Sequence, residues 1–175
     1  MRLRLDMCDV DFQLKIKDWH AYTSSFLDDD LWTHDEFLLK GKYIDYSFDS
    51  EVLLSSEVVY LRNALDALLR GIIKEKTEIS FAEPDFIFKL SPAQRLFDEP
   101  GKVVYRDGYK DVDINMEMIV QFWCSGGLGA NYFSMLFDRN DIEALYLYLC
   151  AETGEIAIDD VRIVKLLDAG VLLPE

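Results

Sequence analysis

The run VDINMEMIVQF at residues 112–122, followed by NYFSMLF at residues 131–137, predicts the centre of the fold. In the first run, apolar side chains alternate with polar ones, which is the period-two pattern of a strand with one buried face. The second run has large apolar residues at odd and even positions, which predicts a strand covered on both faces. Glycines within 126–129 predict a turn between the two runs. We therefore expect a hairpin in the middle of a sheet.

Helices are expected to cover these strands. Asn140 stands three residues before Glu143, the spacing of a capping box, and the apolar stripe that follows ends near Gly154. An earlier stripe begins at Ser55 or Ser56, either of which could cap it, and ends near Gly71. The two main predicted helices cover about 56–70 and about 140–152. A short C-terminal helix is predicted at about 159–169, with Asp159 or Asp160 as its cap and an apolar face of Val161, Val164 and Leu167.

The remaining chain has the pattern of short strands separated by turn residues. Residues 2–17 alternate with one change of phase near Met7 and Cys8, which indicates either a bulge or two strands. Further strand pairs are expected at 31–39 with 42–48, at 78–81 with 85–90, and at 102–106 with 109 onward, around the turn Asp107-Gly108. The predicted fold class is α+β, predominantly antiparallel β-sheet built from hairpins or a meander, with a sandwich as one arrangement.

The length and composition are those of one folded domain, residues 1–175. Half of the residues are hydrophobic, which argues against a disordered chain. Residues 155–175 are expected to form a C-terminal extension that docks either on the domain or on a second copy, which would make a homodimer. The cysteines Cys8, Cys124 and Cys150 show no metal or disulfide spacing, and we interpret them as buried residues of a reducing compartment. No signal peptide or membrane span is apparent, so a cytoplasmic location is expected.

The charge of the chain favours a basic partner. The sequence contains 18 Lys and Arg residues against 33 Asp and Glu residues, which gives a net charge of −15. A nucleic-acid-binding protein needs a basic face to displace counterions, and no cluster of basic residues is seen, so direct nucleic-acid binding is not expected. The alternative is that the acidity serves solubility alone.

A short acidic segment is the candidate partner-binding site. Five acids occur in nine residues without one Lys or Arg, and a tryptophan lies in the same segment. An acidic patch around an aromatic anchor suits a site that attracts and then holds a basic protein. The alternative is a solvated loop that leads into an edge strand guarded by charges. The candidate residues are Asp28, Asp29, Asp30, Trp32, Asp35 and Glu36.

No residue pattern specifies a reaction. The two histidines, His20 and His34, are too far apart in the sequence to suggest a metal site. The glycines at 126–129 join two strand patterns and are not followed by a phosphate-binding helix, and the pattern at 111–115 reads as the solvent face of a strand. We therefore predict no catalytic residue, no metal and no cofactor, and expect that the protein is not an enzyme.

The order of the predicted elements resembles the WapI-type immunity proteins. The resemblance is carried by the helix 56–70 ending at Gly71, by the run ISFAEPDFIF at 79–88, by the long strand that follows and by the helix that begins at 141–143. The family consists of small acidic bacterial proteins that protect a cell from its own contact-delivered toxin, which in the namesake carries a tRNA-cleaving nuclease domain. The resemblance implies a non-enzymatic inhibitor that occludes a cationic toxin domain.

A second interpretation is a β-rich module that binds a small molecule or a sugar, with or without weak hydrolytic activity. Trp19, Trp32 and Trp123 could form a stacking platform for a sugar, although tryptophans more often pack in a core. A pocket lined by Trp or Tyr would favour this module, and an acidic face without such a pocket would favour the inhibitor.

Overall fold

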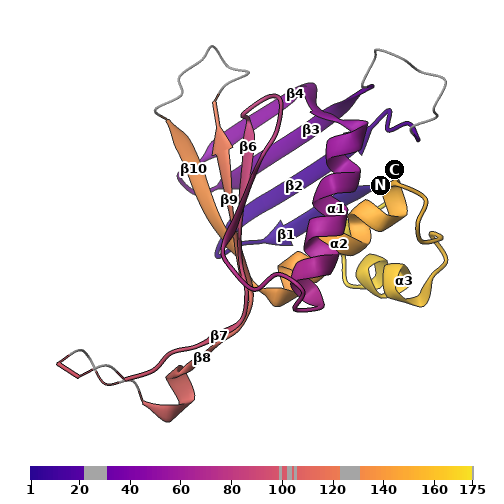
Figure 1. Cartoon of the computed structure of the whole chain (residues 1–175). Coiled ribbons are helices and arrows are strands. Elements are labelled where there is room, and N and C mark those ends of the chain that lie inside the picture. The colour runs from indigo at the N-terminus through magenta and orange to yellow at the C-terminus, as the bar shows by residue number, and fades with distance from the viewer. Residues whose placement is uncertain (22–30, 99, 102–103, 105, 123–130, 175) are drawn as a thin grey trace.

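Two antiparallel sheets form the centre of the molecule in the computed structural model, which describes residues 1–21, 31–98, 100–101, 104, 106–122 and 131–174. The described strands of the first sheet are, in spatial order, β11 (Leu172–Leu173), β1 (Arg2–Asp6), β2 (Val10–Lys17), β3 (Trp32–Gly41) and β4 (Asp45–Leu54). Those of the second sheet are β10 (Tyr132–Phe137), β9 (Asn115–Gln121), β6 (Phe86–Ser91) and β5 (Thr77–Ser80). The predicted α+β fold with antiparallel sheets is confirmed (Figure 1).

The first sheet has one apolar face and one polar face because its strands follow the period-two pattern. In β2, Phe12, Leu14 and Ile16 are buried, whereas the residues between them are partly exposed. The N-terminal segment forms two strands, because Cys8 and Asp9 take positive φ angles of 55° and 71° and reverse the chain between β1 and β2. The structure therefore selects the two-strand alternative over the bulge.

The predicted long strand at 112–122 is interrupted. Its second part forms β9, in which Met116, Met118 and Val120 are buried, as the alternation predicts. Its first part belongs to the short strand β8 (Asp111–Val112), which pairs with β7 (Gln94–Arg95) outside the second sheet. The hairpin of β9 and β10 is present, but β10 lies at the edge of the sheet with Leu136 66% exposed, so the prediction of a doubly covered central strand was wrong.

Aromatic side chains join the two sheets. The ring of Phe37 on β3 lies 5.5 Å from that of Phe12 on β2 and 5.4 Å from that of Phe86 on β6, centroid to centroid. The ring of Phe137 at the end of β10 lies 5.5 Å from that of Phe12. These rings fill the space between the sheets, where edge-to-face and tilted contacts add to the burial of apolar surface.

Helix α1 (Ser55–Leu69) ends before Gly71, whose φ angle is +67°. Of its predicted apolar stripe, Leu69 is partly buried and the other residues are buried: Val58, Leu61, Leu65 and Leu68. The predicted serine caps are wrong. The N-cap residue is Leu54, which has no side-chain acceptor, and its N–H donates to the Glu57 carboxylate at 2.9 Å. The acid three residues into the helix therefore supplies the capping bond that the serines do not.

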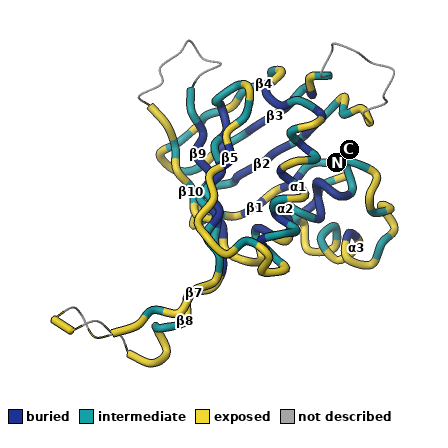
Figure 2. The backbone as a smooth tube through the Cα atoms, viewed as in Figure 1, coloured by how far each residue is buried: buried dark blue, intermediate teal, exposed yellow. Residues whose placement is uncertain are grey.

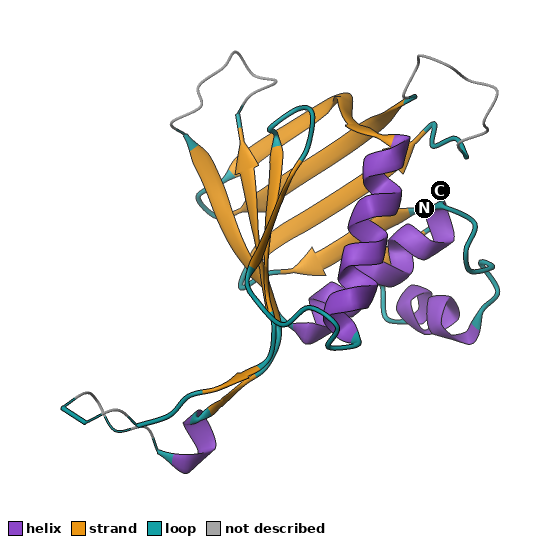
Figure 3. Ribbon diagram, viewed as in Figure 1, coloured by secondary structure: helices purple, strands orange, loops and turns teal. Residues whose placement is uncertain are grey.

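Helix α2 (Arg139–Glu152) begins at an Asp138 cap, two residues before the predicted Asn140 cap. The Asp138 carboxylate accepts hydrogen bonds from the N–H groups of Asn140 and Asp141 at 2.7 and 3.0 Å. Helix α2 packs against α1 and β1 (Figure 3), and Ala144, Leu147 and Tyr148 are buried in addition to the predicted stripe. Because two faces of α2 are buried, the single apolar stripe predicted from the sequence accounts for only part of its buried residues.

The C-terminal segment docks on its own chain. Helix α3 (Val161–Asp168) is capped by Asp160, and β11 then pairs antiparallel with β1, with Arg2 opposite Leu173. The predicted apolar face of α3 was wrong for Val161 and Val164, which are exposed, whereas Leu167 is partly buried against the core and Ile163 is fully buried.

A projecting hairpin leaves the body between β6 and β9 (Figure 1), and we call its segment, 92–113, the arm, of which residues 92–98, 100–101, 104 and 106–113 are described. It contains β7, β8 and a 3-10 turn at Asp107–Tyr109. The Asp107-Gly108 pair lies in this turn, so the predicted two-residue hairpin there was wrong. Val104 and Arg106 lie outside any strand, and the other residues of the predicted strand at 102–106 are outside the described residues.

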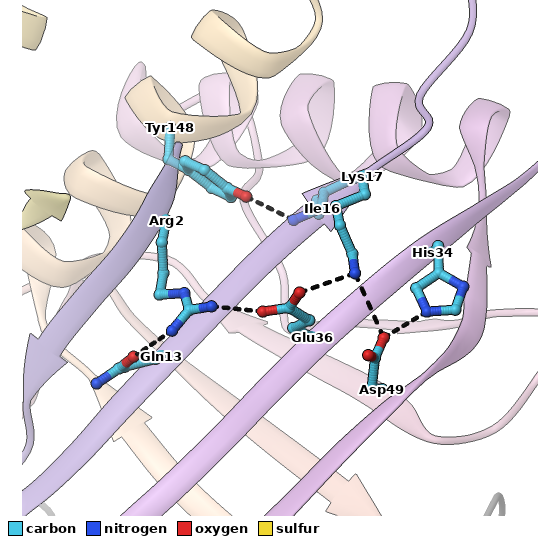
Figure 4. A network of polar contacts seen from close by, with 8 residues as sticks. All are labelled: Arg2, Gln13, Ile16, Lys17, His34, Glu36, Asp49 and Tyr148. Carbon is cyan, nitrogen blue, oxygen red and sulfur yellow. Dashed lines mark hydrogen bonds and ion pairs between the residues drawn. The ribbon is translucent and has the colours of Figure 1, made fainter. Parts of the chain in front are cut away.

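Tyr148 links α2 to the first sheet, and replacing it with phenylalanine is expected to destabilise the fold. Its buried hydroxyl accepts a 2.7 Å hydrogen bond from the N–H of Ile16, at a point where β1 has ended its pairing with β2 (Figure 4). The Tyr148→Phe change leaves this N–H buried without that acceptor, which costs about 1–3 kcal/mol. Urea denaturation measures the loss. The exposed Tyr132→Phe change is the control and should alter the free energy of unfolding by less than about 0.5 kcal/mol.

Candidate partner-binding surface

The two described acids of the candidate site, Asp35 and Glu36, lie on opposite faces of one strand. Asp28, Asp29 and Asp30 lie outside the described residues. Trp32, at the start of β3, is 36% exposed, and Asp35 is fully buried. Glu36 lies on the solvent-facing side of the same strand, opposite to Asp35. The placement of Asp35 in a surface site was therefore wrong, because neighbouring residues of a strand point to opposite faces.

Asp35 is part of a buried ring of hydrogen bonds. The N–H of Leu53 donates to Oδ2 of Asp35 at 3.1 Å, and the Thr33 hydroxyl lies 3.1 Å from Oδ1 of Asp35 and 2.9 Å from the Leu53 carbonyl oxygen. A hydroxyl has one proton to donate. If the Thr33 proton goes to the Leu53 carbonyl, a protonated Asp35 can donate to the Thr33 oxygen, and every polar atom of the ring is satisfied. Burial raises the pKa of Asp35 to about 7, in agreement with this neutral form.

Glu36 belongs to a network of paired charges on the outer face of the first sheet (Figure 4). It forms ion pairs with Arg2 and with Lys17, whose ammonium lies 2.8 Å from the carboxylate. Lys17 also lies 3.5 Å from Asp49, which contacts His34. The hydrogen bond from Lys17 lowers the pKa of Glu36. Because the acids of this network are paired with bases, this face does not present the unbalanced negative charge that a cationic partner requires.

An apolar groove of about 600 Å³ lies where the edge of the second sheet meets one end of the first. It is bordered by the β1–β2 turn, the β3–β4 loop, β10 and the start of α2, and the aspartates Asp6, Asp138 and Asp141 lie at its rim. The residues that line it between these aspartates are Met7, Cys8, Val10, Leu39, Ile44, Phe133, Ser134, Met135 and Leu136. None of the described lining residues is Trp or Tyr.

Backbone N–H groups hold the rim carboxylates in place. Asp138 accepts the two capping bonds of α2, Asp141 accepts from the N–H of Asp138 at 3.1 Å, and Asp6 accepts from the N–H of Asp9 at 3.3 Å. Partial burial raises the pKa of Asp141, and the nearby charge of Asp138 raises it further. Each carboxylate has four lone-pair sites, so the rim keeps acceptors in fixed positions for a donor from outside.

The groove runs beside a free strand edge. Strand β10 pairs with β9 along one side, and no strand of the described chain pairs with its other side. An unpaired edge presents backbone N–H and C=O groups to which an extended segment of another protein can bind. The groove therefore combines apolar contact, a free backbone edge and three carboxylates.

The other candidates from the sequence have structural roles where they are described. The indole N–H of Trp19 donates to the Ser55 carbonyl at 3.1 Å, so this ring packs on the body, and Trp123 lies outside the described residues. Cys150 is buried, but Cys8 is exposed in the groove, which corrects the prediction of a buried thiol; Cys124 is not described. Within the described ranges, no group of three His, Cys, Asp or Glu side chains could hold a metal ion.

The described helices include none that is long and apolar enough to span a membrane. The groove itself could not be found by inspecting the sequence, because it is assembled from three separated segments, 6–10, 39–44 and 133–141. One signal was available: the apolar residues at odd and even positions of 131–137 lie on the two faces of an edge strand, with Phe133 and Met135 packed against the core. Comparison with family models, curated proteins and solved structures gave no significant match.

Proposed function

We propose that the protein is a non-enzymatic acidic inhibitor, an immunity protein that binds and occludes a cationic bacterial toxin domain in the cytoplasm. The observation that carries the proposal is the acid-rimmed apolar groove beside the free edge of β10, on a chain of net charge −15. The resemblance of the element order to the WapI-type immunity proteins supports the same function.

The binding mechanism would have two stages. The negative field of the chain would speed the approach of a cationic domain, since opposite charges raise association rates in a salt-dependent manner. Apolar contact in the groove would then slow dissociation, because buried apolar side chains supply most of the binding energy of such interfaces. The partner would be occluded by the bulk of the bound chain, without chemistry.

Capture of the partner tests the proposal. The purified chain, used as bait in extracts of the source organism at low and high salt, should recover a basic polypeptide with a toxin-like domain, identified by mass spectrometry. Retention at high salt would indicate buried contacts in addition to charge. Recovery of acidic or unrelated proteins alone, at both salt concentrations, would contradict the proposal.

Neutralising the rim should weaken this capture. The double change Asp6→Asn and Asp138→Asn removes two charges but keeps the side-chain oxygens that accept the Asp9 and helix N–H bonds. We expect the association rate, measured by surface plasmon resonance with the captured partner at low salt, to fall about 3- to 10-fold, with a shallower salt dependence. The matched control, Asp159→Asn with Asp168→Asn, removes the same charge far along the sequence from the groove residues. Equal rates for the two variants would exclude the groove as the binding site.

The second candidate is a module that binds a small molecule or a sugar, with or without weak hydrolytic activity. The groove volume of about 600 Å³ lies within the range of ligand sites, which is the observation in its favour. Against it stand the absence of Trp and Tyr among the described lining residues and the three carboxylates at the rim. A metabolite and glycan screen by thermal shift, read against a Met135→Lys variant, distinguishes this candidate from the inhibitor.

A further inference from the structure

The arm, residues 92–113, exposes large apolar side chains away from the body. Phe97 is 75% exposed, Tyr109 is 72% exposed and Val104 is 74% exposed. Figure 2 shows the arm as a largely exposed hairpin that projects from the molecule. Single exposed apolar residues are ordinary, but an isolated two-stranded hairpin is barely stable in water by itself. Three such residues on one projecting hairpin indicate that another surface covers it.

Internal contacts give the arm a defined form. The Lys110 ammonium lies 2.7 Å from the Asp98 carboxylate, and the Leu96 N–H donates to the Lys110 carbonyl at 2.7 Å. At the base, the Arg139 guanidinium forms two hydrogen bonds with Asp113, at 2.8 and 2.6 Å, which lower the pKa of Asp113 to about 2. Arg139 follows the groove residue Asp138, so the base of the arm adjoins the rim of the groove.

Charge indicates which surface the arm can meet. Residues 92–113 contain four basic and five acidic residues, so nearly all of the net charge of −15 lies on the rest of the chain. The arm therefore contributes little to the repulsion between two equally acidic copies, and its net charge of about −1 gives it little attraction for a cationic partner. Phe97 and Tyr109 suit the apolar floor of the groove, and Arg106 suits its acidic rim.

We propose that the arm of one copy lies in the groove of a second copy, and that the exchange is reciprocal. Because the base of each arm adjoins its own groove, a two-fold axis near this point would let each arm cross to the other groove and close the assembly. Strands of about ten residues reach roughly 30 Å, enough to cross a neighbouring molecule. The proposal concerns the free protein and does not depend on the proposed function. A cationic partner would have to displace the arm to enter the groove.

Sedimentation equilibrium of the free protein tests the assembly. The wild-type chain of 20.3 kDa should sediment as a dimer at tens of micromolar, and Phe97→Ser with Tyr109→Ser should weaken the dimer by at least about 100-fold. The control Tyr60→Ser removes an exposed aromatic from α1 and should leave the dimer intact. A wild-type monomer at 100 µM, or a dimer unchanged by the arm variant, would overturn the proposal. If the arm variant still formed the dimer but no longer captured the partner, the arm would bind the toxin and not a second copy, which would also overturn the proposal.

Cross-linking tests the contact itself, since Cys8 is exposed in the groove. A Gly108→Cys variant, which keeps Tyr109 and places the thiol where a Cβ meets no other atom, should give a covalent dimer with a short bis-maleimide, and the additional change Cys8→Ser should abolish most of it. Covalent dimer formed equally without Cys8, or no cross-link in a protein that still sediments as a dimer, would place the arm elsewhere and overturn the proposal.

Discussion

An Asp35→Asn variant is expected to lose most of the decline in stability that the wild-type protein shows between about pH 4 and pH 7. The folded state holds the pKa of Asp35 at about 7, whereas its ordinary value is 3.8. Between these values the folded protein binds the proton and the unfolded chain does not, so stability falls as the pH rises. The total loss from this group is about 4 kcal/mol at most, since one pKa unit corresponds to about 1.4 kcal/mol.

The asparagine keeps the buried ring. Its oxygen can accept from the Leu53 N–H, and its amide can donate to the Thr33 oxygen, as the protonated acid does. Urea denaturation at pH 5 and pH 8 measures the difference, with the exposed Asp159→Asn variant as control. The control should keep the wild-type decline. A wild-type stability that rises from pH 5 to pH 8, or a decline of equal size in Asp35→Asn and in the control, would contradict a protonated Asp35 in the folded protein.

A Phe37→Ala variant is expected to lose about 3–5 kcal/mol of stability, enough to unfold many domains of this size. Phe37 is 2% exposed, and its ring contacts Phe12 in its own sheet and Phe86 in the other. Removing it opens a cavity between the sheets that neither sheet can close without moving. Urea denaturation followed by far-ultraviolet circular dichroism measures the loss.

Two further variants make this result specific. Phe37→Leu retains most of the volume and should cost less than half as much. Tyr43→Ala removes a side chain that is 89% exposed and should be nearly neutral. If Phe37→Ala cost no more than Tyr43→Ala, the two sheets would not be joined by this cluster.

Local sequence patterns predicted helices and strands well where burial of a single face was the main constraint. The alternation in β2 and β9 and the stripe of α1 each reflect burial of one face, so period and burial agree. The helix starts were less predictable. Asp138 caps α2 instead of Asn140. Several adjacent polar residues can accept hydrogen bonds from the first N–H groups of a helix, and the backbone conformation before the helix determines which of them becomes the cap.

The candidate site was harder to predict than the fold. The burial of Asp35 follows from the same alternation that buries Phe37 and Leu39, so the period-two rule already separates it from Glu36. The groove depends on the distance between β10 and the first sheet, and no local pattern specifies that distance. The arm could not be anticipated either, because Ile114 continues the alternation of 112–122 while the chain leaves the sheet before Asn115.

Growth protection tests the central claim most directly. The toxin-like domain captured by the bait is expressed in a bacterial host, alone and together with the chain or its Asp6→Asn, Asp138→Asn variant. The account predicts that the domain alone stops growth, that the wild-type chain restores it, and that the rim variant restores it less well than the charge-matched Asp159→Asn, Asp168→Asn control. Arrested growth in the presence of the bound wild-type chain would contradict the inhibitor function.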